Sequence, residues 1–131
     1  MKHAAPVMKR QGGGSIISTA SAAGLRTGLG PHVYSAAKAA VIHLTHSVAM
    51  ELGERGVRVN CICPGGIATP QGVRALAGPG RAGDPLMKGV LETLQPIKRL
   101  GLPQDIADAA FWLATDDSSF VNVTLSSSTA A

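Results

Sequence analysis

Aromatic residues are scarce in this sequence of 131 residues: Phe, Trp and Tyr together make up 3% of it, and only one tyrosine is present. Nucleic-acid binding through aromatics interleaved with basic residues is therefore not expected, although the formal net charge is +4. No apolar run approaches the roughly 18 residues of a membrane span, and no signal-peptide-like stretch follows the first residues. We expect a cytoplasmic protein that binds neither nucleic acid nor membrane.

Cysteine is rarer still, with single residues at positions 61 and 63. Both lie in a segment that we expect to be a strand, where residues two apart point to the same face. An extended segment does not bring two such cysteines into comfortable disulfide geometry. We therefore expect two reduced, buried thiols, as in cytosolic proteins.

The length indicates one domain, and the hydrophobic fraction of 45% is that of a globular protein. A β-branched segment between glycines predicts a strand over residues 15–19. An apolar stripe predicts a helix over residues 34–52 and is formed by Val41, Leu44, Val48 and Leu52. A second strand is predicted over residues 57–63. Strand, helix and strand make a βαβ unit, so we predict an α/β fold with a parallel sheet.

The rest of the chain is less regular. The Gly- and Pro-rich residues 70–83 predict a mobile loop, and a helix is expected from there to about Leu94. Another helix is predicted over residues 103–114, with Pro103 in its first turn. Residues 121–131 are small and polar, which predicts a frayed tail.

Three groups of residues are expected at one edge of the sheet. In open α/β sheets, ligands bind beyond the carboxyl ends of the strands. Ser21 follows the first strand, residues 65–69 follow the second, and Tyr34 begins the helix between them. The sequence therefore predicts a binding site where these three groups meet.

Tyr34 and Lys38 are four residues apart, so on a helix they share a face. Free tyrosine has a pKa of about 10, and a nearby cation favours tyrosinate. Such a tyrosine can exchange a proton with a hydroxyl or carbonyl group. Taken alone, the spacing more often marks a solvated helix face, and Ser21 and Thr69 more often are a turn serine and a helix cap.

Four motifs, taken in order and spacing, resemble the short-chain dehydrogenase/reductase family. They are the segment ending at Ser21, the pair Tyr34-x-x-x-Lys38, the run from Arg58 to Thr69, and residues 99–107. The resemblance spans about residues 14–121. It implies the C-terminal half of a Rossmann-like, doubly wound parallel sheet, with residues 70–94 as a substrate lid.

The resemblance also implies a reaction, which is hydride transfer between NAD or NADP and a secondary alcohol or ketone. The sequence resembles members that act on cyclic secondary alcohols or diols, and a cyclic substrate is therefore an expectation. Tyr34 would be the general acid/base, Lys38 would lower its pKa and hold the nicotinamide ribose, and Ser21 would bind the substrate oxygen. The remaining cofactor-binding residues would be Pro64, Gly65, Ile67 and Thr69. No metal is implied, and a homo-oligomer through helix 34–52 is expected.

The family's Gly-rich dinucleotide turn and the residue that selects NAD or NADP lie upstream of the serine, and only twenty residues precede Ser21. We therefore expect an incomplete domain with two strands and exposed edges, prone to poor solubility or oligomerisation. After Asn122 the sequence departs from the family pattern, and we hypothesise a frameshifted tail. The alternative functions are an inactive fragment and an interaction module that uses helix 34–52.

Overall fold

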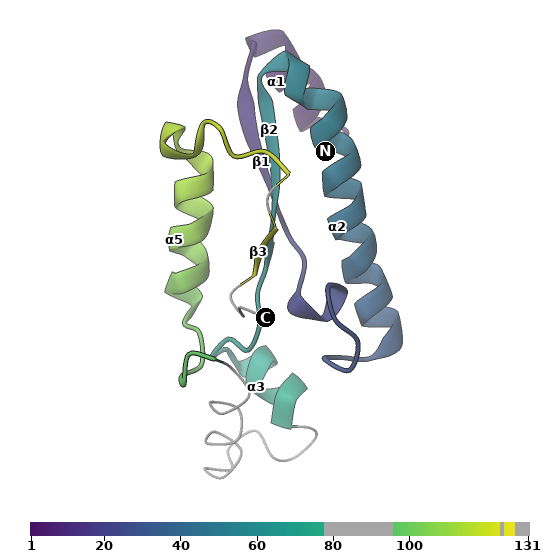
Figure 1. The fold of residues 1–131 in the computed structure, drawn as a ribbon, viewed down its shortest axis with the longest axis vertical. Helices are drawn as coiled ribbons and strands as arrows, with labels where there is room; N and C mark the ends of the chain where they lie inside the picture. The colour runs from purple at the N-terminus through teal and green to yellow at the C-terminus, as the bar shows by residue number, and fades with distance from the viewer. Residues whose placement is uncertain (78–95, 124, 128–131) are drawn as a thin grey trace.

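The computed structural model describes residues 1–77, 96–123 and 125–127. Three parallel strands form one sheet in the order β1-β2-β3, with α2 on one face and α5 on the other (Figure 1). The predicted α/β fold with a parallel sheet is confirmed. The elements are α1 (Ala4–Gln11), β1 (Gly14–Thr19), α2 (His32–Leu52), β2 (Val57–Cys63), α3 (Pro70–Ala77), α5 (Pro103–Ala114) and β3 (Leu125–Ser127).

Strand β2 is the centre of the fold, and its side chains alternate between the two helical layers. Val57 and Val59 pack against Ala49 and Leu52 of α2. Further along the same face, the cysteines of β2 pack against Ile42 of α2 and Ala20 after β1, in a cluster made by Ala20, Ile42, Cys61 and Cys63. Because β2 is covered on both faces, its residues read as a nearly continuous buried run, as expected in a parallel sheet.

The other face of β2 carries polar side chains that hold α5. The Arg58 guanidinium donates to the carbonyl oxygens of Leu113 and Thr115, at 2.9 and 3.1 Å, and to Ser118 Oγ at 2.9 Å. These acceptors lie at the C-terminal end of α5, where helix carbonyls lack intrahelical donors. Asn60 Nδ2 donates to the Val121 carbonyl at 2.9 Å and holds the chain that leaves this end. Arg58 and Asn60 therefore belong to the scaffold.

The predicted apolar stripe of α2 is wrong in one place. The buried residues of α2 are Ile42, Thr45, Ala49 and Leu52, whereas the Leu44 side chain is 54% exposed. Leu44 lies outside the face that meets β2, together with exposed Val33 and Met50. The helix also begins at His32 instead of Tyr34, because Pro31 occupies the N-cap position and its carbonyl accepts the Ser35 N–H at 2.9 Å. Tyr34 is thus the third residue of α2.

Two segments differ from the expected loop and tail. Residues 70–77 form α3 instead of a mobile loop, because the Thr69 hydroxyl caps the helix by accepting the Gly72 N–H at 2.9 Å. Leu125–Ser127 form β3 instead of a frayed tail, pairing in parallel with β2. The expected two-strand sheet therefore has a third strand. The rest of the predicted lid (78–94) and of the tail (128–131) lies outside the described residues.

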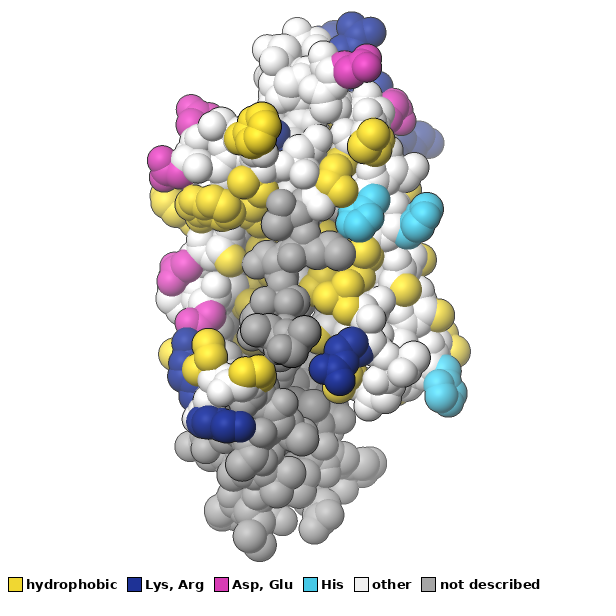
Figure 2. All heavy atoms as spheres, viewed as in Figure 1, with side chains coloured by type: hydrophobic (Ala, Val, Ile, Leu, Met, Phe, Trp, Pro, Cys, Tyr) yellow, Lys and Arg dark blue, Asp and Glu magenta, His cyan; other side chains and the backbone are white. Residues whose placement is uncertain are grey.

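Apolar side chains also reach the surface away from the sheet. Over α5 and the turn after it, Phe111, Trp112 and Phe120 are exposed, and acidic side chains line the same edge of the molecule (Figure 2). Among the residues that the structure describes, no helix has both the length and the apolar character needed to cross a bilayer.

Candidate active site

The carboxyl ends of β1 and β2 are joined by backbone hydrogen bonds. The Ala20 N–H donates to the Ile62 carbonyl at 2.8 Å, and the Ala22 N–H donates to the Pro64 carbonyl at 2.9 Å. Ser21 lies between these two bonds, directly after β1. Its hydroxyl accepts the Ala23 N–H at 3.2 Å and so begins a 3-10 turn. The predicted turn role of Ser21 is thus present, and it leaves the hydroxyl proton able to donate.

The first turn of α2 brings Tyr34 and Lys38 to this edge. Lys38 Nζ lies 5.8 Å from the centroid of the Tyr34 ring, which is within cation–π range. The same ammonium group donates to the Thr19 carbonyl at 3.1 Å. Lys38 therefore connects α2 to the end of β1, two residues before Ser21. The Tyr34 side chain is 42% exposed and can meet a ligand from solvent.

Gly24 allows the turn after Ser21 to lie directly against α2. A Cβ at this position would be 2.7 Å from the Lys38 carbonyl carbon and 2.8 Å from the Ala39 nitrogen. Both distances are shorter than real carbon contacts. The absence of a side chain at Gly24 is therefore what permits the turn after Ser21 to pack directly against the main chain of α2 at Lys38.

The turn after β2 is held against the segment before α5. Gly101 donates to the Gly66 carbonyl at 2.9 Å, and the Ala68 N–H donates to the Gly101 carbonyl at 2.8 Å. Within the described part of the chain, the Ile67 N–H has no hydrogen-bond partner. Thr69 Oγ1, which accepts from Gly72, keeps its own proton. A backbone donor and a hydroxyl on one turn suit the oxygen and nitrogen of a carboxamide.

The predicted site residues are brought together in part. Ser21, Tyr34 and Lys38 converge where β1 meets α2, and the Pro64 carbonyl bonds directly to the residue after Ser21. The turn that contains Gly65, Ile67 and Thr69 begins at that point. Between the described side chains, no hydrogen bond joins the Ser21 and Tyr34 hydroxyls.

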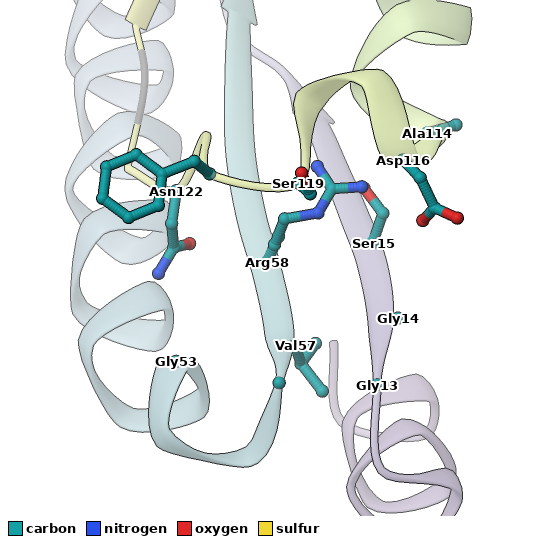
Figure 3. Close-up of a pocket in the computed structure, with 12 residues that line it drawn as sticks. Gly13, Gly14, Ser15, Gly53, Val57, Arg58, Ala114, Asp116, Ser119 and Asn122 are labelled. Carbon is teal, nitrogen blue, oxygen red and sulfur yellow. The ribbon is translucent and has the colours of Figure 1, made fainter.

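A cavity lined by described residues lies elsewhere. It has a volume of about 720 Å³ and lies at the amino ends of β1 and β2, next to Gly14, Val57 and Asn122. None of the predicted site residues lines it. Figure 3 shows Arg58 extending across this cavity from β2 toward the turn after α5, where its guanidinium caps the helix. We assign this hollow to the scaffold, because its charged group is already used in capping.

Sequence reasoning missed two neighbours of the site. Thr19 contributes a backbone carbonyl to Lys38, which no side-chain pattern could indicate. Cys63 ends β2 and is fully buried, in a cluster with Ala20, the residue before Ser21. As expected, Cys61 and Cys63 are free and share one face, with their sulfur atoms 4.0 Å apart. The position of Cys63 at a strand end, two residues before Gly65, was the available signal.

The Arg99–Asp105 pair fixes the start of α5 beside the turn after β2. Arg99 Nη1 and Nη2 donate to the two Asp105 carboxylate oxygens at 2.6 and 2.9 Å, and the Leu102 N–H also donates to Asp105, at 2.6 Å. The Arg99 hydrogen bonds, followed by that from Leu102, lower the pKa of Asp105 to about 2. Because Arg99 precedes Gly101 by two residues, this ion pair also anchors the segment that holds the turn.

The stability contributed by Asp105 is expected to depend on pH. A carboxyl group whose pKa is lower in the folded state stabilises the fold above its unfolded value of about 3.9, and that stability is lost as the pH falls toward 2. Urea unfolding should be measured between about pH 5 and about pH 2, the range that this pKa shift sets. The free energy of unfolding should fall more steeply with acid in the unmodified chain than in Asp105→Asn. If the free energy of unfolding fell equally steeply with acid in both proteins, the Arg99–Asp105 pair would contribute nothing to stability. Arg99→Gln, which removes the other partner, should behave like Asp105→Asn.

Comparison with known proteins adds a family match. A protein-family model described as enoyl-(acyl carrier protein) reductase matches residues 1–126. Zerumbone synthase from Zingiber zerumbet is 40% identical over 126 residues, which cover 93% of this chain and 47% of that protein. Xanthoxin dehydrogenase from Arabidopsis thaliana is 40% identical over 125 residues, covering 93% and 44%. The chain thus spans less than half the length of these two relatives.

Solved structures agree with the fold. The crystal structure of levodione reductase superposes with a TM-score of 0.87 at 33% identity, covering 98% of this chain and 50% of that one. A structure of ElxO with NADP bound has a TM-score of 0.83 at 27% identity, covering 97% and 49%. Each similarity therefore extends over nearly the whole of this chain.

Proposed function

Because this chain belongs to the short-chain dehydrogenase/reductase family of oxidoreductases, we propose that it serves hydride transfer between NAD or NADP and a secondary alcohol or its ketone. The observation that carries this proposal is the position of Lys38. Its ammonium group lies 5.8 Å from the Tyr34 ring and is fixed to the end of β1 by the Thr19 carbonyl. A fixed cation beside a phenol, next to the Ser21 hydroxyl, is an arrangement for moving a proton.

We assign the proton transfer to Tyr34. When an alcohol is oxidised, its hydroxyl proton would pass to Tyr34 Oη as the hydride leaves the carbon. In the reverse direction, Tyr34 Oη would give its proton to the ketone oxygen. The Lys38 ammonium group, 5.8 Å from the centroid of the Tyr34 ring, would stabilise negative charge that develops on Tyr34 Oη as the proton leaves. Ser21 Oγ, which keeps its proton while accepting from Ala23, would donate to the substrate oxygen and orient it.

The nicotinamide end of the cofactor would lie on the turn after β2. The cofactor supplies the hydride acceptor or donor, and the protein supplies binding and orientation. We propose that the Ile67 N–H and the Thr69 hydroxyl bind the carboxamide, with Pro64 and Gly65 forming the surface beneath. Lys38 would bind the ribose, and Tyr34 would lie beside it. The NADP found in the related ElxO structure supports a nicotinamide cofactor, with the choice between NAD and NADP left open.

The proposed substrate is a small alcohol or ketone, in line with relatives named as dehydrogenases and reductases, such as (+)-borneol dehydrogenase 2 from Salvia officinalis. A cyclic substrate is our preferred form. We also propose that the protein self-associates through α2, in line with its exposed apolar residues Val33, Leu44 and Met50. Each of these proposals is made for the whole protein as well as for this chain.

The first test is binding of NADH and NADPH to the purified chain, followed by cofactor fluorescence. We expect saturable binding in the micromolar range, weakened about tenfold or more in Lys38→Met because a hydrogen bond from a charged donor is lost. Lys2→Met is the matched control, since it removes an exposed lysine outside the site. No binding at millimolar cofactor would contradict the proposal and favour an inactive fragment.

A further inference from the structure

Strand β1 lies at an edge of the sheet, and its outer side has no partner strand among the described residues. It pairs with β2 alone, in the sheet order β1-β2-β3. Both of its faces are covered, since Ile16 packs against the apolar cluster under α2 and Ser15 Oγ donates to the Leu113 carbonyl of α5 at 2.8 Å. Every residue of β1 is nevertheless at least partly exposed, whereas all but one residue of β2 are buried. The exposure of β1 therefore comes from its open edge.

The parallel ladder decides which main-chain groups of β1 face outward. In such a ladder, alternate residues of a strand direct their N–H and carbonyl groups to the neighbouring strand. The Ala20 N–H donates to the Ile62 carbonyl at 2.8 Å, so the residues two and four positions before Ala20 also bond to β2. The N–H and carbonyl groups of Ser15, Ile17 and Thr19 therefore point away from β2. Apart from the Thr19 carbonyl, none of these groups has a hydrogen-bond partner within the described part of the chain.

The sequence of β1 does not protect this edge. Exposed edge strands in natural proteins are usually blunted by charged side chains, by proline, by a bulge or by short length. Strand β1 contains only glycine, serine, isoleucine and threonine, and its six residues keep an unbroken register with β2. The strand at the other edge, β3, has only three residues. The outer side of β1 is therefore a template on which another extended strand can pair.

The edge is also complementary to itself. A two-fold axis at Ile17 would place two copies of β1 side by side and antiparallel, as a closed dimer of identical edges requires. Each Ile17 would exchange both main-chain hydrogen bonds with the second copy's Ile17, and each Thr19 N–H would donate to the second copy's Ser15 carbonyl. Lys38 keeps its bond to the Thr19 carbonyl, because these contacts do not need that group. The two isoleucine side chains would lie directly opposite each other, flanked by serine–threonine pairs, and both kinds of cross-strand pair are favourable.

We propose that β1 is a dimerisation edge, at which a second copy of this chain adds its own β1 in antiparallel orientation and joins the two sheets into one. The occupant is a second copy because pairing about Ile17 matches a donor on each edge with an acceptor on the other. This surface is distinct from α2. The pairing uses main-chain groups of β1, so it occurs whether or not the chain binds a cofactor.

The direct test is amide hydrogen exchange of the unmodified chain at increasing protein concentration, with the mass followed by sedimentation. The Ile17 and Thr19 amides should exchange about tenfold more slowly once about nine-tenths of the chain is dimeric, because they then exchange only after dissociation. The Ile16 and Ser18 amides, which face β2 within one copy, are the internal control and should change far less. A chain that stays monomeric at millimolar concentration would overturn the proposal. An unchanged Ile17 rate in an associated chain would assign the association to another surface and also overturn it.

Ile17→Lys tests the same edge by charge. The two-fold axis would place the two lysines directly opposite each other, so the dimer dissociation constant should rise at least about tenfold. Ile97→Lys is the matched control, because it makes the same change at a side chain that is 67% exposed outside the sheet, and it should change the constant less than about twofold. Both variants are also given Leu44→Lys, so that association through α2 does not contribute. Equal dissociation constants in the two variants would overturn the proposal, and if Ile17→Lys does not fold, the exchange of Ile17 in the unmodified chain decides.

Discussion

Replacing Tyr34 with Phe is expected to lower the rate of alcohol oxidation by about 10²–10⁴-fold, the range that general acid–base catalysis contributes. Phe keeps the ring that Lys38 contacts and removes only the hydroxyl that would carry the proton. The measurement is the initial rate of NADH or NADPH formation by the purified chain. Because the side chain is 42% exposed, the change should leave the unfolding midpoint nearly unaltered.

Ser35→Ala is the matched control for Tyr34→Phe. It removes a hydroxyl from the next residue of the same helical turn, where Ser35 Oγ makes only a long contact of 3.5 Å with the Gly30 carbonyl. The control should keep its rate within about twofold, as expected for a weak hydrogen bond outside the reaction. A Tyr34→Phe rate equal to that of Ser35→Ala would exclude Tyr34 as the acid/base group.

Gly24→Ala is expected to destabilise the fold by about 1–3 kcal/mol, the usual cost of adding a methyl group to a filled space. The new Cβ would meet the backbone of α2 at Lys38 and Ala39, and backbone cannot rotate away as a side chain can. Either the turn after Ser21 or the start of α2 must shift. We therefore expect weaker NADH binding as well as a lower urea midpoint.

Gly13→Ala is the control for Gly24→Ala. A Cβ at Gly13 would meet the Gly56 carbonyl oxygen at 3.5 Å, which is an ordinary contact, so the free energy of unfolding should change by less than about 0.5 kcal/mol. Unfolding by urea, followed by circular dichroism, measures both variants. If Gly24→Ala were as stable as Gly13→Ala, the close approach of the Ser21 turn to α2 would not constrain the site.

Local sequence patterns were enough to predict the positions of much of the sheet and of its helices. Residues 57–63 are rich in valine, isoleucine and cysteine and are followed by Pro64, and they form β2 with those bounds. Pro103 similarly marks the start of α5. The prediction failed at residues 70–77, where Gly and Pro indicated a loop, because the Thr69 cap outweighs their weak local preference.

The residues of the candidate site were predicted only in part, because local patterns do not record contacts between distant segments. Tyr34 and Lys38 share a face because helical periodicity is local, and Ser21 was located by its distance from a strand end. The Thr19 carbonyl was not recognised as a neighbour of Lys38, and Cys63 was not recognised as a neighbour of Ala20, the residue before Ser21. Each belongs to another segment, and a pairing between segments leaves no periodic signal in either one.

The sequence by itself determined β1, β2, most of α2 and α5, and that chemically active residues follow the strands, since both depend on residues near one another in the chain. Only the tertiary structure decided that Arg58 caps α5, that Leu44 is exposed and that Leu125–Ser127 form a third strand. Those outcomes depend on which face of each element meets another. Such contacts join residues tens of positions apart, as Lys38 joins Thr19 across 19 residues and Arg58 joins Leu113 across 55.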